Sequence, residues 1–286
     1  MLDQLTILAP GLLGASVAMA ARRYGAARRI AAWARRPEVR IQLESAPWCD
    51  EVCATPEDAA REASLVVICA PVETIPALAT AIRPHLRATA LVTDVGSVKG
   101  DLCRRAAAAY DAAAGPLFVG SHPMAGSEKC GHEAGSAELF QGRACFVTPF
   151  DQTPAPAVET LVRFWRALGC EVVTMHPDRH DEIVAHVSHL PHLAAACLCS
   201  LLSGRHADWR NLAGPGLRDT TRVASGDPRL WRGILAENRD EVLRALRAYQ
   251  DELQALHAAL ANHNDLELLA LLERGKVWRD RLRPTS

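Results

Sequence analysis

The sequence has little of several features that mark particular classes of protein. Aromatic residues are only 5% of the 286, and Lys99, Lys129 and Lys276 are the only lysines among 32 basic residues. A formal net charge of -1 lacks the basic excess typical of nucleic-acid binders. No apolar run reaches the roughly 20 residues that a membrane span needs. Asp3 stands where a signal peptide would be positively charged. We therefore expect neither nucleic acid nor a membrane as partner.

The cysteines also lack the pattern of a disulfide or zinc framework. There are nine, an odd number, and several lie inside apolar runs. The pairs Cys49/Cys53 and Cys197/Cys199 have no matching second pair, so we expect no metal site. Scattered unpaired thiols are typical of a reducing compartment, which predicts a cytoplasmic protein.

What is present is an alternation of short apolar runs with alanine-rich helical stretches. A helix is predicted over 12–24. The runs read as strands at 5–9, 29–33, 64–71, 90–95, 116–120, 144–148 and 171–175. Nearly continuous apolar strands suit a parallel sheet covered on both faces, and the alternation indicates βαβ units. The fold class is therefore α/β, with a doubly wound, Rossmann-type domain over residues 1–175.

The pattern changes after His176. Residues 178–203, 228–262 and 264–282 carry apolar side chains at helical spacing, and no convincing strand follows Pro177. This predicts an all-helical second domain over residues 176–286.

The first predicted strand runs into a turn that resembles a dinucleotide-binding loop. Ala9-Pro10-Gly11-Leu12-Leu13-Gly14 matches G-x-G-x-x-G, except that Ala9 replaces the first glycine. Such a turn brings the backbone and the start of the next helix to a pyrophosphate. We expect Ala9, Gly11, Leu12, Leu13 and Gly14 at the cofactor.

The end of the second strand bears on the choice between NAD and NADP. An acidic residue there binds a free ribose 2′-hydroxyl, whereas arginine suits a 2′-phosphate. This chain has Ala34, Arg35 and Arg36, which favours NADP and leaves NAD open. A merely solvated basic surface is the alternative. Ala70, Pro71 and Asp94, at or near the ends of later strands, complete the expected cofactor contacts.

Four segments carry polar residues suited to chemistry: Thr93–Lys99, Gly120–Glu128, His186–His192 and Gly216–Arg222. The first two follow predicted parallel strands, whose carboxyl ends are where open α/β sheets bind ligands. Their combination (SHPMAGSE, SHLPH and RDTTR) and their order resemble the prephenate/arogenate dehydrogenase family of tyrosine biosynthesis over nearly the whole chain.

The resemblance implies a homodimer that oxidatively decarboxylates prephenate or arogenate with NAD⁺ or NADP⁺ and without a metal. It implies that His122 is the catalytic base and that Ser97 helps to hold it and the substrate hydroxyl. Arg222 would pair with a substrate carboxylate, a task suited to guanidinium. The remaining substrate-binding residues that it implies are Ser121, Glu128, His180, Ser188, His189 and His192.

Two other classes fit a Rossmann domain followed by helices. β-Hydroxyacid dehydrogenases generally use a lysine of the helical domain, but only Lys276 is present there. A dinucleotide-sensing protein without catalysis would not need Ser97, His122 and Arg222 together. The sequence leaves open the choice of prephenate or arogenate, and also inhibition by tyrosine, which resembles the product.

Overall fold

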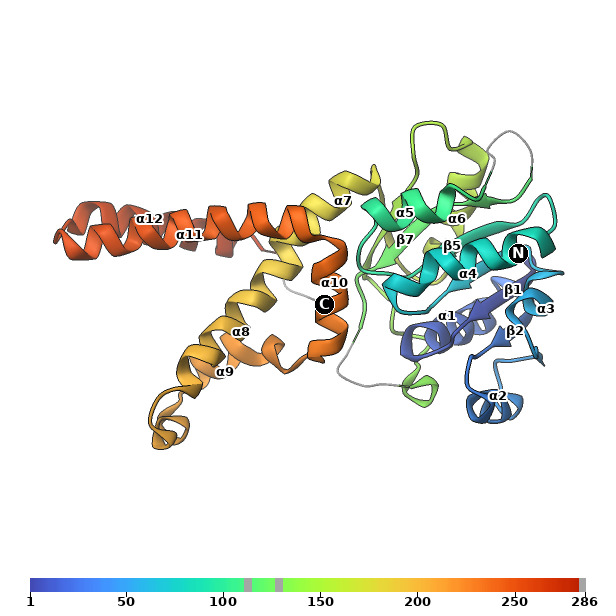
Figure 1. Cartoon of the computed structure of the whole chain (residues 1–286), viewed down its shortest axis with the longest axis horizontal. Helices are drawn as coiled ribbons and strands as arrows, with labels where there is room; N and C mark the ends of the chain where they lie inside the picture. Colours follow the sequence, from blue (N-terminus) through green and yellow to red (C-terminus); the bar gives the residue numbers. More distant parts are fainter. Residues whose placement is uncertain (111–114, 127–130, 283–286) are drawn as a thin grey trace.

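The computed structural model describes residues 1–110, 115–126 and 131–282. Figure 1 shows two parts, a sheet domain that contains the N-terminus and a helical part that follows it in the chain. The last strand ends at Thr174 and the first helix of the second part begins at Pro177. This change supports the domain division at residue 176 that we propose from the sequence.

Six parallel strands form the main sheet, in the order β3-β2-β1-β4-β5-β6. Their bounds are β1 Leu2–Leu8, β2 Ala27–Trp33, β3 Glu51–Val52, β4 Leu65–Ile68, β5 Leu91–Asp94 and β6 Leu117–Phe118. This is the doubly wound order: successive strands are added on one side of β1 up to β3 and on its other side from β4 onward, so the order of addition reverses between β1 and β4. The ligand crevice of such sheets lies outside the carboxyl ends of the strands at that point.

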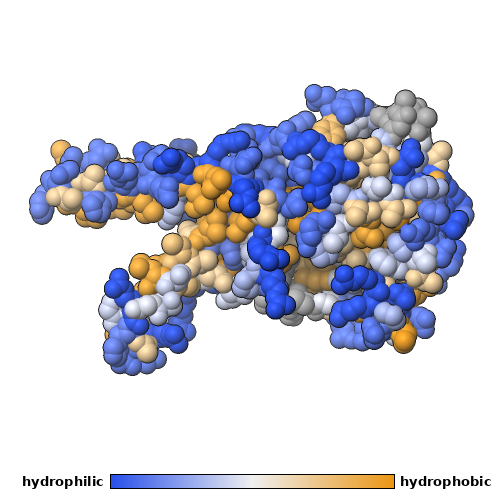
Figure 2. Space-filling view, in the orientation of Figure 1, coloured by the Kyte–Doolittle hydropathy of each residue, from blue (hydrophilic) through white to orange (hydrophobic). Residues whose placement is uncertain are grey.

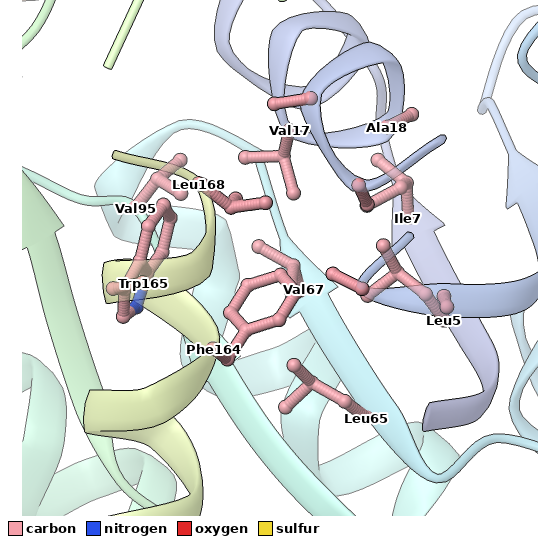
Figure 3. Packing of buried hydrophobic residues seen from close by; sticks show 14 of the residues in the cluster. Leu5, Ile7, Val17, Ala18, Leu65, Val67, Val95, Phe164, Trp165 and Leu168 are labelled. Atoms are coloured by element: carbon pink, nitrogen blue, oxygen red, sulfur yellow. The ribbon is translucent and has the colours of Figure 1, made fainter. Parts of the chain in front are cut away.

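Helices cover both faces of this sheet, as continuous apolar strands require. They are α1 Leu12–Arg23, α2 Pro37–Glu44, α3 Pro56–Ala60, α4 Ile75–Ile82, α5 Gly100–Ala107 and α6 Ala155–Ala167. Alternate strand residues face opposite clusters, so Leu5 and Val67 pack with α1 and α6 (Figure 3), while Leu8 and Val66 pack with α3, α4 and α5. The predicted α/β class is confirmed.

A second, three-stranded sheet contains β7 Gly120–Pro123, β8 Ala144–Thr148 and β9 Glu171–Thr174. β7 is antiparallel to β8, and β8 is parallel to β9. The sequence did not separate β7 from the strand at 116–120, and it missed the two-residue β3. His122 therefore lies within a strand of the small sheet, and not in a loop after a parallel strand as predicted.

The described residues of the second part form helices and the turns between them, without a strand. It contains α7 Pro177–Val184, a π-helical turn η4 Ala185–His189, α8 Leu190–Ser203, a 3₁₀ helix η5 Ala207–Leu212, α9 Pro215–Thr221, a 3₁₀ helix η6 Arg222–Ser225, α10 Pro228–Glu237, α11 Arg239–Ala261 and α12 Asp265–Asp280. The prediction of a single helix over 228–262 is wrong, because the helix is interrupted at Asn238, between α10 and α11. Helices α8–α9 and α11–α12 extend as two arms (Figure 1).

The stretch Pro177–Ser203 is long and apolar enough to cross a membrane by length and composition alone. Its first turns carry Asp178, Arg179, Asp181 and Glu182, and it contacts α5 and η6. Hydrophobic surface also gathers where the two arms diverge (Figure 2). Only 28% of its most apolar window is buried within this chain, so we interpret the stretch as a helix of the helical part that leaves apolar side chains exposed on the arm.

Candidate active site

A cavity of about 710 Å³ lies at the carboxyl edge of the sheet, beside the turn after β1. Seven predicted cofactor residues line it: Ala9, Gly11, Ala34, Arg35, Arg36, Ala70 and Pro71. Trp33, Thr74 and Leu78 add to its wall, as do His132 and Glu133 of the 3₁₀ helix η3 His132–Ala134. None of these five was predicted to contact the cofactor. The loop of His132 and Glu133 reaches the cavity because the Ser136 N–H donates to Ser16 Oγ of α1 at 3.0 Å.

The turn after β1 fits a pyrophosphate. Helix α1 has no side-chain cap, so the N–H groups of its first turn, at Leu12, Leu13 and Gly14, lack intrahelical partners. A Cβ on Gly11 would meet nothing within 4 Å, which leaves open space for a ligand. A Cβ on Gly14 would lie 3.0 Å from Ile7 and 3.1 Å from Cys69, so Gly14 permits close packing of helix on strand. Leu12, Leu13 and Gly14 are not among the residues that line the cavity.

Ala9 takes the place of a glycine in a conformation that favours glycine, with φ = +59°. An L-residue in this region is strained by about 1–2 kcal/mol relative to glycine. Replacing Ala9 by glycine removes that strain, but it also gives the unfolded chain more conformational freedom, which offsets part of the gain in stability. We expect Ala9→Gly to raise the free energy of unfolding by about 0.5–1 kcal/mol in urea titrations. Ala9→Val should lower it, because a β-branched residue fits this region worse. A lower free energy of unfolding for Ala9→Gly than for the wild type would contradict strain at Ala9.

Asp94 does not face the cavity, contrary to the prediction. It is fully buried, and its carboxylate forms an ion pair with the equally buried ammonium of Lys99. The same carboxylate accepts the N–H groups of Gly96 at 2.8 Å and Ser121 at 3.2 Å. Asp94 thus organises the turn after β5 and joins it to β7.

His122 is the buried histidine of β7, with 9% of its surface exposed. Its Nδ1 lies 2.9 Å from Nε2 of His180, and Nδ1 of His180 lies 2.7 Å from Oδ1 of Asp181. Burial lowers the pKa of His122 well below its usual range, and His180 and Lys99 lower it further. His122 is therefore neutral near pH 7 and able to accept a proton.

His180 was predicted to bind substrate, but its two ring nitrogens are used by His122 and Asp181 and it is fully buried. Ser121 is also fully buried. Its hydroxyl donates to the Asp94 carbonyl at 2.8 Å, accepts from Trp165 Nε1 at 3.0 Å and lies 2.7 Å from Thr93 Oγ1. His180 thus holds the ring of His122, and Ser121 joins β7 to β5 and α6. Neither side chain offers a free polar group to a substrate.

Ser97 is half-buried in the turn between β5 and α5, and its hydroxyl makes no hydrogen bond to a described residue. Ser188 is half-buried within the π-helical turn η4, a feature often found at functional sites. Arg222 is exposed at the start of η6 and pairs with no carboxylate in the described part of the chain. The predicted Glu128 lies outside the described residues.

Two histidines of the helical part, His189 and His192, contact Trp231 of α10. His192 stacks on the indole, with ring centroids 3.6 Å apart, and His189 meets it edge-on at 6.1 Å. His189 Nδ1 lies 3.2 Å from Asn238 Nδ2, while His192 Nδ1 is buried without a partner among the described residues. Of the predicted histidines, His192 thus keeps a free buried nitrogen for a ligand.

The buried histidines predict acid-sensitive stability. Burial lowers the pKa of His189 to about 4, and it lowers those of His122 and His180 as well. Because unfolded histidine titrates near 6.5, the unfolded chain binds more protons between about pH 6.5 and 4, so stability falls as pH falls through that window. His189 alone should remove roughly 2 kcal/mol between pH 8 and 5. Urea midpoints of wild type and His189→Gln measure this difference.

The exposed His186 gives the matched control, since it lies in the same π-helical turn. His186→Gln should keep the wild-type pH dependence, whereas His189→Gln should flatten it. Equal slopes for all three proteins would contradict this origin of the acid sensitivity.

Around the buried histidines, four further residues were not recognised from the sequence: Lys99, Asp181, Trp231 and Asn238. Asp181 directly follows His180 and Lys99 closes the Thr93–Lys99 segment, so motif position could have marked both. Asn238 is a polar residue at the break between two helices, where it donates to the Asp181 carbonyl at 2.9 Å. We find no sequence signal for Trp231. Among the described residues no group of three His, Cys, Asp or Glu side chains could hold a metal ion.

Two family models together match almost the whole chain. The prephenate dehydrogenase nucleotide-binding domain matches residues 17–174, and the prephenate dehydrogenase dimerization domain matches residues 176–274. The chain belongs to the prephenate dehydrogenase family. The predicted family is therefore confirmed, and the protein is an oxidoreductase with a nicotinamide dinucleotide cofactor.

Relatives of this family resemble the chain over most of their length. The cyclohexadienyl dehydrogenase of Zymomonas mobilis is 34% identical over 270 residues, which are 93% of this chain and 91% of the relative. The prephenate dehydrogenase of Bacillus subtilis is 30% identical over 99% of this chain and 76% of its own. The prephenate dehydrogenase of Aquifex aeolicus, solved with hydroxyphenyl propionate and NAD⁺, superposes with a TM-score of 0.91 at 30% identity, covering 99% of both chains. The arogenate dehydrogenase of Synechocystis gives a TM-score of 0.86 at 29% identity, covering 97% of this chain and 99% of its own.

Proposed function

We propose that this protein oxidatively decarboxylates prephenate or arogenate, giving 4-hydroxyphenylpyruvate or tyrosine. Hydride passes from ring C4 to the nicotinamide of the cofactor, which supplies the oxidising power. Loss of CO₂ then makes the ring aromatic, which drives the reaction. The chain must supply a base for the C4 hydroxyl, a cation for carboxylate and a fixed alignment of the reacting atoms.

The buried, neutral His122 is the observation that carries this proposal. Its Nδ1 is engaged by His180, and its Nε2 has no hydrogen-bond partner among the described residues. A held imidazole with one free nitrogen can take a hydroxyl proton, a task that binding a dinucleotide alone does not require. We assign Arg222 to a substrate carboxylate, and Ser97, Ser188 and His192 to substrate positioning.

An assay of both substrates with both cofactors, followed by absorbance of the reduced nicotinamide, tests the function directly. We expect turnover with at least one pair. Absence of turnover with all four pairs, in protein that still binds cofactor, would contradict the proposal in favour of a dinucleotide-sensing protein or another dehydrogenase. Tyrosine added to the same assay tests whether it competes with substrate.

We propose that NADP⁺ is preferred over NAD⁺. Arg35 and Arg36 line the cavity, are exposed and pair with no carboxylate in the described part of the chain. Arg40 fixes the turn that presents them, donating to the carbonyls of Ala34 and Arg35 at 2.8 and 3.2 Å. The side chain of Ala34 cannot bind a ribose hydroxyl, whereas a guanidinium group can bind a phosphate through two parallel hydrogen bonds.

Replacing Arg35 or Arg36 by alanine is expected to lower the ratio of kcat/KM for NADP⁺ to that for NAD⁺. A charged hydrogen bond of about 1.5–3 kcal/mol corresponds to about a 10- to 150-fold change in this ratio. Arg28→Ala removes a charge from the other end of β2, where Arg28 pairs with Asp3, and should leave the ratio unchanged. An unchanged ratio in both single variants and the double variant would rule out these arginines.

We propose a homodimer formed through the helical part. Exposed apolar side chains run along α11 and α12: Leu243, Leu253, Leu260, Leu266, Leu269, Leu272 and Trp278. A second copy of the dimerization domain would bury such a surface. Light scattering should report twice the chain mass of 30.9 kDa, and a monomer would contradict the assignment. Cytoplasmic location remains our proposal from the unpaired cysteines.

A further inference from the structure

His122, His180 and Asp181 form a continuous chain of hydrogen bonds that crosses from β7 to α7. The two contacts are 2.9 and 2.7 Å long, and the three residues are 9%, 0% and 5% exposed. His180 is packed edge-on against Phe146, which holds its ring between the two partners. Water therefore has little access to these hydrogen bonds. Which nitrogen of each histidine carries the proton depends on the group to which it is bonded.

The acceptor at the end of the chain fixes the direction of both bonds. Asp181 Oδ1 also accepts the N–H of Lys99 at 2.7 Å, and Oδ2 accepts the N–H of Gly100 at 2.7 Å. An ionised carboxylate can only accept, so His180 must donate from Nδ1. Burial keeps His180 neutral by lowering its pKa, which leaves its Nε2 as an acceptor. His122 must then donate from Nδ1 and carry its lone pair on Nε2.

We propose that Asp181, acting through His180, is the positioning residue that sets the tautomer of His122 and so makes its Nε2 the proton acceptor. The inference rests on the proposed function and deepens it. When the substrate O–H bond breaks, the proton moves to His122 Nε2 while hydride leaves C4 for the nicotinamide. His122 then carries a positive charge, and its Nδ1–H remains bonded to His180. The negative charge of Asp181, relayed by the polarised His180 ring, stabilises that charge in a buried site where Lys99 opposes it.

Asp181→Asn separates this role from simple packing. With its oxygen kept on the Gly100 N–H, the amide donates through Nδ2 to His180 Nδ1 and gives up the contact with the Lys99 N–H. Both bonds then reverse, which places the proton of His122 on Nε2. We expect kcat to fall by about 10³–10⁴-fold, as a wrong tautomer does in other histidine bases, with KM changed only a few-fold. Asp178→Asn is the matched control. Asp178 lies one turn earlier on α7, is exposed and pairs with Arg104, so its variant should keep both constants.

Nitrogen-15 NMR of histidine-labelled protein reads the tautomer without any substrate. We expect the wild type and Asp178→Asn to show His122 protonated at Nδ1, and Asp181→Asn to show it protonated at Nε2. A wild type protonated at Nε2, or an Asp181→Asn variant with unchanged tautomer and kcat, would overturn the proposal. Because this measurement needs no turnover, it stays decisive even if neither proposed substrate reacts.

His180→Phe is a second variant that tests the same role if Asp181→Asn does not fold. It leaves Asp181 bonded to the N–H groups of Lys99 and Gly100 and keeps an aromatic ring against Phe146. We expect a mixture of His122 tautomers and a lowered kcat, with cofactor binding retained. A single Nδ1–H tautomer with wild-type kcat in this variant would likewise overturn the role of the chain.

Discussion

Replacing His122 by asparagine is expected to lower kcat by about 10²–10⁴-fold, the range that a positioned general base contributes. The effect should fall on kcat far more than on KM, because the interaction forms as the hydroxyl proton is transferred. Asparagine retains polar atoms in β7 but cannot accept a proton. Steady-state kinetics at saturating cofactor measures the split, and cofactor titration confirms that the dinucleotide site remains intact.

The pH profile adds an independent check on the same residue. A base must be unprotonated, and burial, His180 and Lys99 all lower the pKa of His122. Activity should therefore persist as pH falls below 6.5 and be lost only when pH passes through the depressed pKa. His186→Asn, which alters an exposed histidine, should leave kcat unchanged. Near-normal turnover of His122→Asn would assign the base to another residue.

Replacing Lys99 by methionine is expected to be the most destabilising single change considered. The ammonium of Lys99 and the carboxylate of Asp94 are paired with both side chains fully buried. Removing one partner leaves a buried charge uncompensated, which costs about 3–5 kcal/mol. Urea unfolding, followed by circular dichroism, should show this loss, and cofactor binding should weaken only where the variant is partly unfolded.

A double-mutant cycle distinguishes the ion pair from lost packing. Asp94→Asn combined with Lys99→Met should be more stable than the sum of the two single losses predicts, because no lone charge remains. Lys276→Met is the control, since Lys276 pairs with Asp280 on the surface of α12. Such an exposed pair contributes about 0–1 kcal/mol. A Lys99 variant no less stable than the Lys276 variant would contradict the buried pair.

Local pattern was sufficient for the elements with strong periodicity. The strands β1, β2, β4 and β5 each contain a short apolar run that the sequence revealed, whereas β3 has only two residues and is too short to leave a pattern. β7 escaped notice because Gly120–Pro123 is polar in composition and pairs only through its backbone with β8. The break at Asn238 was missed for a similar reason, because apolar spacing continues on both sides of it.

The sequence by itself determined the order of elements, the dinucleotide turn around Gly11 and Gly14, the basic end of β2 and the candidate base His122. These depend on residues near one another in the chain, where spacing and residue type constrain the backbone. Tertiary structure decided which side chains hydrogen-bond to His122 and position it. His180 lies 58 residues away, and Asp181 meets the start of α5 across 82 residues from Lys99. Tertiary structure also buried the Asp94–Lys99 pair and engaged the Ser121 hydroxyl in hydrogen bonds. Contacts between distant segments depend on how whole elements pack, and no local pattern in the sequence records them.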